Sequence, residues 1–319
     1  AGSRPRIVGP ALAVVALVVA ACGSEAETGA NPSTSPPDRS NQETAAAAEA
    51  PTTVPSSTTT EAPRGALTIQ GVGDVNFDPS YIPNLAANGF EFAFEGLDGI
   101  FLDDDLTVIN LECAPSNLGD PIEKAFNFRC DPNALAVAKA NGVDVASLAN
   151  NHGLDYGVEA MLDGQANIEA AGIASVGVGN NLNEAITPAL FEVEGWTVAV
   201  LGMNGVVTAQ WWLADDTQAG MASGDDINQM VAAVEAADEV ADIVFGHHSH
   251  RLGDVEFIDG RPVFWTLGNF VWPRLSDAGA TTAVGRAVVN PDGSIDACLI
   301  PAFIATSGRP ELTGPTGCE

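Results

Sequence analysis

Positive charge is scarce in this sequence of 319 residues. It has 12 Lys and Arg against 42 Asp and Glu, which gives a formal net charge of −30. Because nucleic-acid binding needs a basic surface, this composition excludes nucleic acid as a partner. It also disfavours direct ion pairing with a polyanionic polymer, and we interpret the acidity chiefly as a solubility feature.

Long hydrophobic runs are also missing. The apolar run over residues 11–21 is too short for a permanent transmembrane helix, and Arg4 and Arg6 precede it. It ends in small residues followed by Cys22, so we expect residues 1–21 to be a signal peptide and Cys22 to be lipidated. The alternative is an ordinary signal with a chance cysteine. We expect an extracytoplasmic protein held by this lipid on the outer face of the cell membrane.

Large apolar side chains are rare in residues 22–64, which are rich in Ser, Thr, Pro, Ala and Glu. Such a segment buries too little apolar surface to offset its ordering entropy, which predicts a disordered tether after the lipidated cysteine. Short apolar runs begin at residue 65. We expect one domain over residues 65–306 and a C-terminal tail over residues 307–319.

Five cysteines fit an exported protein. Without Cys22, four remain, and they allow three pairings. We favour the two local pairs, Cys113 with Cys130 and Cys298 with Cys318. Their spacings do not resemble a zinc site.

The apolar runs predict an α/β fold. The first half reads as βαβ units, and the second half is richer in hairpins. Expected strands cover residues 66–72, 105–110, 143–148, 174–178, 189–193, 196–201, 241–245, 254–258, 262–266, 283–289 and 295–300, and expected helices 131–141, 157–171 and 225–240. Together they predict two facing mixed sheets with helices outside, a four-layer αββα sandwich.

Four polar clusters follow apolar strands, at the carboxyl ends where ligands bind in α/β sheets. The clusters are Gly73-Asp74, Asn110-Leu111-Glu112, Asn150-Asn151-His152 and His247-His248-Ser249-His250. Carboxylate, amide and imidazole groups together suit a divalent ion such as Mn²⁺, Zn²⁺ or Fe²⁺. The sequence therefore predicts a metal site at this edge.

Histidine is rare, and its distribution sharpens the prediction. All four histidines of the chain lie in these clusters. His248 and His250 are two apart on extended chain, so they are expected to point to the same side. We predict that at least two of His247, His248 and His250 bind metal; the alternative is a polar loop without metal.

Several segments resemble motifs of the CapA family of poly-γ-glutamate capsule synthesis. These are residues 145–152 with 154–157, residues 241–250 and residues 266–270, with Gly73-Asp74 and Asn110-Leu111-Glu112 in the expected order. The resemblance covers about residues 67–305. It implies a fold similar to calcineurin-like metallophosphoesterases.

The resemblance also implies roles for individual residues. Asp74 and Glu112 would be carboxylate ligands, with Glu112 the bridge if two ions bind. His152 would be a general acid or transition-state stabiliser. The remaining implied ligands are Asn151 through its amide oxygen, His248 and His250, with Asn110, His247 and Asn269 as further ligands or rim residues. One or two Mn, Fe or Zn ions would then support hydrolysis at a phosphoryl or acyl centre.

The sequence departs from the family pattern in three places. Ser249 stands where Pro is usual, and Asn76 where many metallophosphoesterases have His. A His-Trp-Gly segment, expected between the central hairpin and the histidine cluster, is missing from residues 203–240. Its loss removes a ligand of a second metal, so the site would hold one ion, or two weakly.

Two main functions remain open. The first is a metal-dependent, phosphoesterase-like hydrolase outside the membrane. The second is a non-catalytic polymer-binding or assembly factor with a degenerate metal site, and a third is a scaffold without any site. Expected partners are poly-γ-glutamate or another anionic envelope polymer, and membrane-embedded capsule synthesis subunits. Lys124 and Arg129 would either meet an anionic substrate or form structural salt bridges, and the tryptophans would line a groove or pack in the core.

Overall fold

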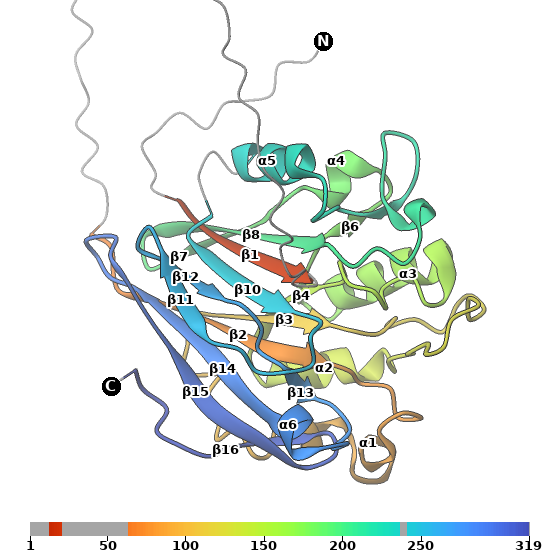
Figure 1. Ribbon diagram of the computed structural model, residues 1–319, viewed down its shortest axis with the longest axis horizontal. Helices are drawn as coiled ribbons and strands as arrows, with labels where there is room; N and C mark the ends of the chain where they lie inside the picture. Colours follow the sequence, from red (N-terminus) through yellow and green to blue (C-terminus); the bar gives the residue numbers. More distant parts are fainter. Residues whose placement is uncertain (1–12, 21–62, 237–240, 319) are drawn as a thin grey trace, which may run out of the picture. The chain divides into compact units, whose positions relative to one another are not determined.

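The computed structural model describes residues 13–20, 63–236 and 241–318. Two mixed β-sheets face each other and helices cover their outer faces, which confirms the predicted four-layer αββα sandwich (Figure 1). Cys22 and nearly all of the predicted tether lie outside the described residues. In the described part of the chain, no helix is long and apolar enough to cross a bilayer.

The six-stranded sheet is parallel in its middle and antiparallel at both edges. Its strands, in spatial order, are β11 (Val255–Ile258), β12 (Arg261–Phe264), β10 (Ile243–His247), β1 (Ala13–Ala20), β8 (Trp196–Asn204) and β7 (Ala189–Val193). The predicted apolar core of the signal peptide therefore forms the strand between β10 and β8. Removal of residues 1–21 by signal processing stays a prediction.

The eight-stranded sheet holds most of the remaining strands. In spatial order they are β16 (Arg309–Leu312), β15 (Ile295–Thr306), β14 (Thr281–Val289), β2 (Leu67–Val75), β3 (Leu106–Leu111), β4 (Val143–Ser147) and β5 (Ala174–Val176), with β13 (Asn269–Val271) also paired to β2. The β2, β3, β4 and β5 strands run parallel. A small separate ladder joins β6 (Val178–Gly179) to β9 (Gly220–Met221).

Three apolar cores separate the layers. The core between the sheets includes Ile69, Val108, Val200 and Phe245, all 2% exposed or less. The helices of the two outer layers and the 3₁₀ turns are α1 (Pro83–Asn88), η1 (Phe90–Ala93), α2 (Asn133–Ala140), α3 (Gly157–Ala170), α4 (Leu182–Ala185), η2 (Gln210–Trp212), α5 (Ile227–Ala236) and α6 (Asp277–Ala280). The α2 and α3 helices pack on the outer face of the eight-stranded sheet, and α4 and α5 cover the other sheet.

The strands deliver their carboxyl ends to one edge. In Figure 1 the tips of β1, β10, β2 and β3 all lie on the right-hand side. At that edge a Cβ on Gly73 would lie 2.3 Å from the carbonyl oxygen of Gly268, so only glycine permits this close approach. The approach lets the amide of Asp74 donate to the same carbonyl at 2.8 Å and holds the end of β2.

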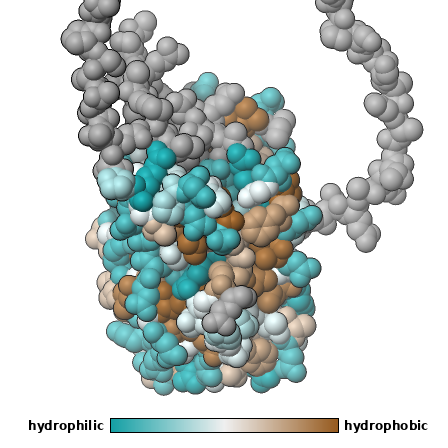
Figure 2. All heavy atoms as spheres, turned by 90° about the vertical axis from the view of Figure 1, so that its left-hand side faces the viewer, coloured by the Kyte–Doolittle hydropathy of each residue, from teal (hydrophilic) through white to brown (hydrophobic). Residues whose placement is uncertain are grey.

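Figure 2 views the side where the parallel strands begin, and hydrophilic and hydrophobic residues are interspersed on it.

The C-terminal residues extend the fold beyond the expected boundary. Residues 307–319, which we expected to be a tail, include β16, which pairs antiparallel with β15. Cys298 on β15 forms a disulfide with Cys318. The described part of this segment therefore belongs to the edge of the eight-stranded sheet.

Candidate metal centre

Two buried carboxylates form one half of the centre. Asp74 lies near the end of β2, Glu112 directly follows β3, and neither is exposed to solvent. The Asn110 amide donates to Asp74 Oδ1 at 2.9 Å, and the Asn150 amide donates to Asn110 Oδ1 at 3.0 Å. This amide ladder crosses β2, β3 and the end of β4, and it fixes the orientation of the Asp74 carboxylate.

Histidines from the other sheet form the second half. His247 ends β10, and its Nδ1 lies 3.3 Å from Asp74 Oδ1. His250 Nδ1 lies 3.0 Å from Asp74 Oδ2, and His250 Nε2 lies 3.8 Å from Glu112 Oε1. The backbone reaches this arrangement with positive φ at His248 (79°) and His250 (53°). Such angles are uncommon outside glycine, and they concentrate where surrounding structure holds a functional loop.

The donor set fits a divalent metal ion. Ligand atoms of Asp74, Glu112 and His250 all lie within 4.8 Å of one another. Both carboxylate oxygens of Glu112 are buried without a hydrogen bond, and the 3.0 Å contact between Asp74 and His250 lacks hydrogen-bond geometry. A buried carboxylate without donors is costly, and a cation between these groups would satisfy it.

The ionisation of these groups also favours a cation. Burial would raise the pKa of Asp74, but the His247 and His250 contacts outweigh it and hold that pKa well below its usual value. Burial, with the nearby Asp74 charge, raises the pKa of Glu112 well above normal. For His250, burial would lower the pKa, and the Asp74 carboxylate reverses this and raises it. Metal ligands must be deprotonated, so a metal ion would compete with protons for Glu112 and His250.

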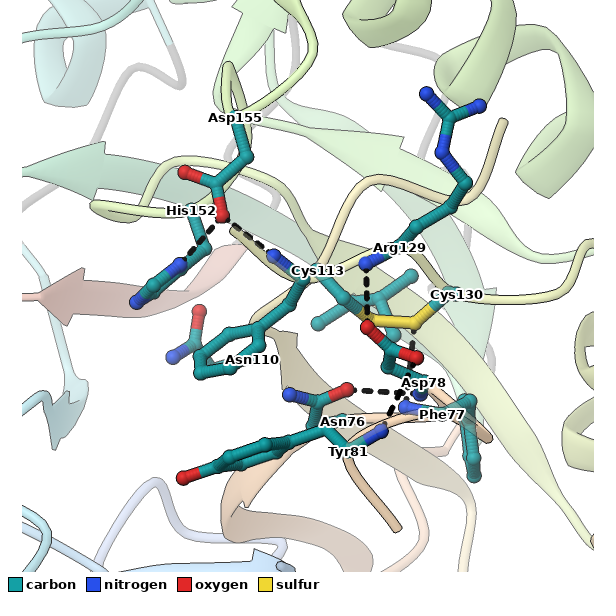
Figure 3. Close-up of a disulfide and its surroundings, with 12 residues drawn as sticks. Asn76, Phe77, Asp78, Tyr81, Asn110, Cys113, Arg129, Cys130, His152 and Asp155 are labelled. Carbon is teal, nitrogen blue, oxygen red and sulfur yellow. Dashed lines mark hydrogen bonds and ion pairs between the residues drawn. A yellow bond between two sulfur atoms is a disulfide. The ribbon is translucent and has the colours of Figure 1, made fainter. Parts of the chain in front are cut away.

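His152 stands beside the carboxylates at the end of β4. Its Nε2 lies 3.8 Å from Glu112 Oε1, and its Nδ1 lies 2.6 Å from Asp155 Oδ2. Lys124 pairs with the other oxygen of Asp155 at 2.6 Å, and the Phe128 ring stacks on the imidazole at 4.3 Å. Burial lowers the pKa of His152. The ring is thus held by Asp155 through Nδ1 (Figure 3), and its Nε2 faces Glu112.

Asp155 was not among the candidate residues from the sequence. It belongs to the motif that follows His152, three residues later, and this spacing was the available signal. Lys124 forms the structural salt bridge that was one of its two expected roles.

The remaining predicted ligands lie around this group. His248 Nδ1 lies 3.1 Å from the Asn151 amide oxygen, so these two side chains contact each other. Asn269 donates to the Gly279 carbonyl at 2.8 Å, and its own Oδ1 is buried without a partner. Metal binding by Asn151, His248 and Asn269 stays a prediction. Asn76 caps the following turn by accepting from the Asp78 amide at 2.8 Å.

A disulfide ties the loop beside the site to the sheet. Cys113, adjacent to Glu112, is bonded to Cys130, and both are buried (Figure 3). This bond closes the loop that carries Lys124 and Phe128. Together with Cys298–Cys318, it gives the two local pairs favoured from the sequence.

Comparisons with known proteins agree with the motifs. The family described as "Bacterial capsule synthesis protein PGA_cap" matches residues 68–238 and 206–274. Residues 206–238 belong to both matches. The chain is 26% identical to the PGA biosynthesis protein CapA of Bacillus subtilis over 270 residues, which cover 70% of this chain and 71% of that protein.

Two further relatives are covered less completely. The chain is 25% identical to the capsule biosynthesis protein CapA of Bacillus anthracis, covering 66% of this chain and 62% of that one. It is 26% identical to a probable polyglutamine synthesis accessory protein of Mycobacterium tuberculosis, covering 52% and 55%.

Solved structures give weaker similarities. The NAD nucleotidase of Haemophilus influenzae aligns with a TM-score of 0.47 at 15% identity, over 78% of this chain and 54% of that one. A hypothetical protein of Thermus thermophilus aligns with a TM-score of 0.43 at 16% identity, over 74% and 99%. Since the family match extends over more than half of the sequence, the chain belongs to the bacterial capsule synthesis protein family PGA_cap.

Proposed function

We propose that this chain is a CapA-like extracytoplasmic protein of poly-γ-glutamate capsule synthesis with a metal-dependent, phosphoesterase-like hydrolase site. One observation carries the catalytic part of the proposal. Asp74, Glu112 and His250 converge from two sheets with buried carboxylate oxygens that lack hydrogen-bond donors. The names of the relatives support the capsule part.

The side chains divide the chemistry between holding an ion and moving a proton. Asp74, Glu112 and His250 would hold Mn, Fe or Zn, since mixed oxygen and nitrogen donors suit these ions. Such an ion would activate water and polarise the scissile bond. Among the described residues there is one carboxylate–histidine group of this kind, so we propose one ion.

His152 is the proposed proton-transfer residue. Asp155 accepts from Nδ1–H and leaves Nε2 facing the reacting centre. Because burial lowers the pKa of His152, the neutral ring is favoured, and Nε2 then accepts a proton, a base role in place of the general-acid role that the family resemblance implies. Lys124 pairs with the other carboxylate oxygen of Asp155 and neutralises its charge.

The proposed partners and location rest on the sequence and on the relatives. Poly-γ-glutamate or another anionic envelope polymer is the proposed partner, together with membrane-embedded capsule synthesis subunits. The signal-like residues 1–21 and Cys22 support export and a lipid anchor on the outer face of the membrane.

Elemental analysis of the purified full chain tests the metal centre. We expect about one equivalent of Mn, Fe or Zn, lost in His250→Ala because a ligand is removed. Ser249→Ala is the matched control, since it changes an exposed side chain of the same loop that is not a predicted ligand. Absence of metal after reconstitution, or full retention by His250→Ala, would contradict the proposal. Chromogenic phosphoesters and γ-linked glutamate oligomers then test for hydrolysis.

The shortened middle region favours a second candidate, a polymer-binding or assembly factor without turnover. The His-Trp-Gly segment is missing from residues 203–240. This candidate predicts polymer binding that is unchanged in His250→Ala, measured by co-sedimentation with poly-γ-glutamate.

A further inference from the structure

An open pocket of about 480 Å³ adjoins the metal centre. His152, His250 and Asn269 form its inner end, where the candidate ligands lie. Phe126 and Leu275 stand at its outer part, exposed by 62% and 76%. These two exposed side chains therefore stand where the pocket meets solvent.

The wall of the pocket differs in charge from the domain as a whole. Residues 65–319 carry 36 Asp and Glu against eight Lys and Arg. Among the described residues that line the pocket there is no Asp or Glu; Lys124 is paired with Asp155 behind the wall, and Arg251 adds positive charge to it. The carboxylates near the pocket are those of the buried metal centre, Asp74 and Glu112. Because the wall itself carries no carboxylate, it suits an anionic group.

Aromatic rings form a continuous wall from the rim to the histidines. The rings of Phe126 and Phe128 stack at 6.4 Å, and Phe128 stacks on His152 at 4.3 Å. On the other side Trp272 contacts His250 at 4.7 Å, and its ring meets the Phe128 ring edge-on at 5.6 Å. Such a wall favours an apolar or ring-bearing group beside a single anionic group. A γ-glutamyl chain would instead place a carboxylate against the rings with each unit.

We propose that the pocket selects an oxyanionic ester with an apolar group, such as a phosphate monoester of a ring-bearing or aliphatic alcohol. The inference rests on the proposed hydrolase function and names its substrate class. In the reaction, the oxygen of water bonds to phosphorus and the ester P–O bond breaks. The alcohol leaves with a proton, and phosphate is the second product. No electron donor or acceptor takes part.

Binding to the metal-loaded full chain tests the pocket without requiring turnover. Phenyl phosphate and methyl phosphate share the anionic group and differ in the apolar one, and γ-linked triglutamate represents the polymer. By calorimetry, we expect phenyl phosphate to bind about tenfold more tightly than methyl phosphate, because the ring is removed from water. The double variant Phe126→Ala/Leu275→Ala should bring this ratio to about twofold or less.

Leu190→Ala is the matched control, since Leu190 is 56% exposed and does not line the pocket. Equal affinities for the two esters, a ratio unchanged in the double variant, or tighter binding of triglutamate would each overturn the proposal. A hydrolysis assay distinguishes failure of the pocket proposal from failure of the hydrolase proposal. Selective binding without hydrolysis supports the pocket and overturns the hydrolase, whereas hydrolysis without preference overturns the pocket alone.

Discussion

The two sheets that meet at the metal centre differ in how the chain builds them. In the eight-stranded sheet, β2, β3, β4 and β5 are neighbours in space in the same order as in the sequence. In the six-stranded sheet, β8 and β10 are not paired with each other, and β1 lies between them. The strand that ends in the histidines is thus paired with a segment more than 200 residues earlier in the chain, and the proposed processing at Cys22 would remove that segment.

The polar side chains show the same contrast. Asp74 is oriented by the Asn110 and Asn150 amides, which are buried within the eight-stranded sheet. His248 and His250 stand on a loop with positive φ and are only partly buried. The carboxylate half of the site is thus fixed by the sheet, whereas the histidine half depends on a loop and on the strand that supports it.

Removing β1 should affect the histidine half of the site more than the carboxylate half. We expect this change to lower the free energy of unfolding more than any other change considered below. The chain 63–319 loses a strand paired on both sides over residues 16–20. At about 1 kcal/mol net per hydrogen bond, its free energy of unfolding should fall by several kcal/mol. The urea concentration at the midpoint of unfolding and the amount of metal retained should both be lower than in the full chain.

A chain lacking only residues 1–11 is the control, because it keeps β1. Equal unfolding midpoints for the full chain and 63–319 would show that β1 does not stabilise the fold. Residues 13–20 would then serve export alone.

The parts predicted best from the sequence are those with local causes. The helix expected over residues 157–171 is α3 (Gly157–Ala170), and the strand expected over residues 143–148 is β4 (Val143–Ser147). Periodicity and flanking glycines determine such elements. Asp74, Glu112 and His250 could be singled out because each lies at or just after the end of an apolar strand.

The parts that the sequence did not predict depend on distant partners. β13 (Asn269–Val271) is only three residues long and is a strand because it pairs with β2. Residues 13–20 have the apolar pattern of a signal peptide, and this pattern is equally that of a strand paired on both sides. Asp155 and Lys124 meet at His152 only through the folded loop.

The two disulfides allow a matched comparison with a smaller effect. They span similar separations, 17 residues for Cys113–Cys130 and 20 for Cys298–Cys318. Replacing either pair with alanine should lower the free energy of unfolding by about 3 kcal/mol through loop entropy. Only the Cys113→Ala/Cys130→Ala variant should also lose His152-dependent activity, because its loop carries Lys124 and Phe128. Equal activity in both variants would mean that packing alone holds this loop.

Glu112→Gln should separate metal binding from stability. Burial raises the pKa of Glu112, so the metal-free fold disfavours its ionised form at neutral pH. Removing the charge should stabilise the metal-free chain by about 1–3 kcal/mol while abolishing metal retention. Thermal unfolding in the presence of a chelator measures the first effect, and elemental analysis measures the second. Glu123→Gln, an exposed position, should change neither, and a destabilised Glu112→Gln chain would contradict the assignment.

The smallest expected effect lies at the other end of the eight-stranded sheet, where Asp104 precedes β3. Burial raises the pKa of Asp104 to about 7, against hydrogen bonds from Thr107 and Gln70 that lower it. The folded state therefore binds this proton more tightly than the unfolded state, and stability should fall as pH rises from about 4 to about 7. Asp104→Asn should remove this slope and raise Tm at pH 7.5 by about 2–4 °C, with little change at pH 4. The neighbouring exposed Asp103→Asn should leave the slope intact, and an unchanged slope in Asp104→Asn would assign it to other carboxylates.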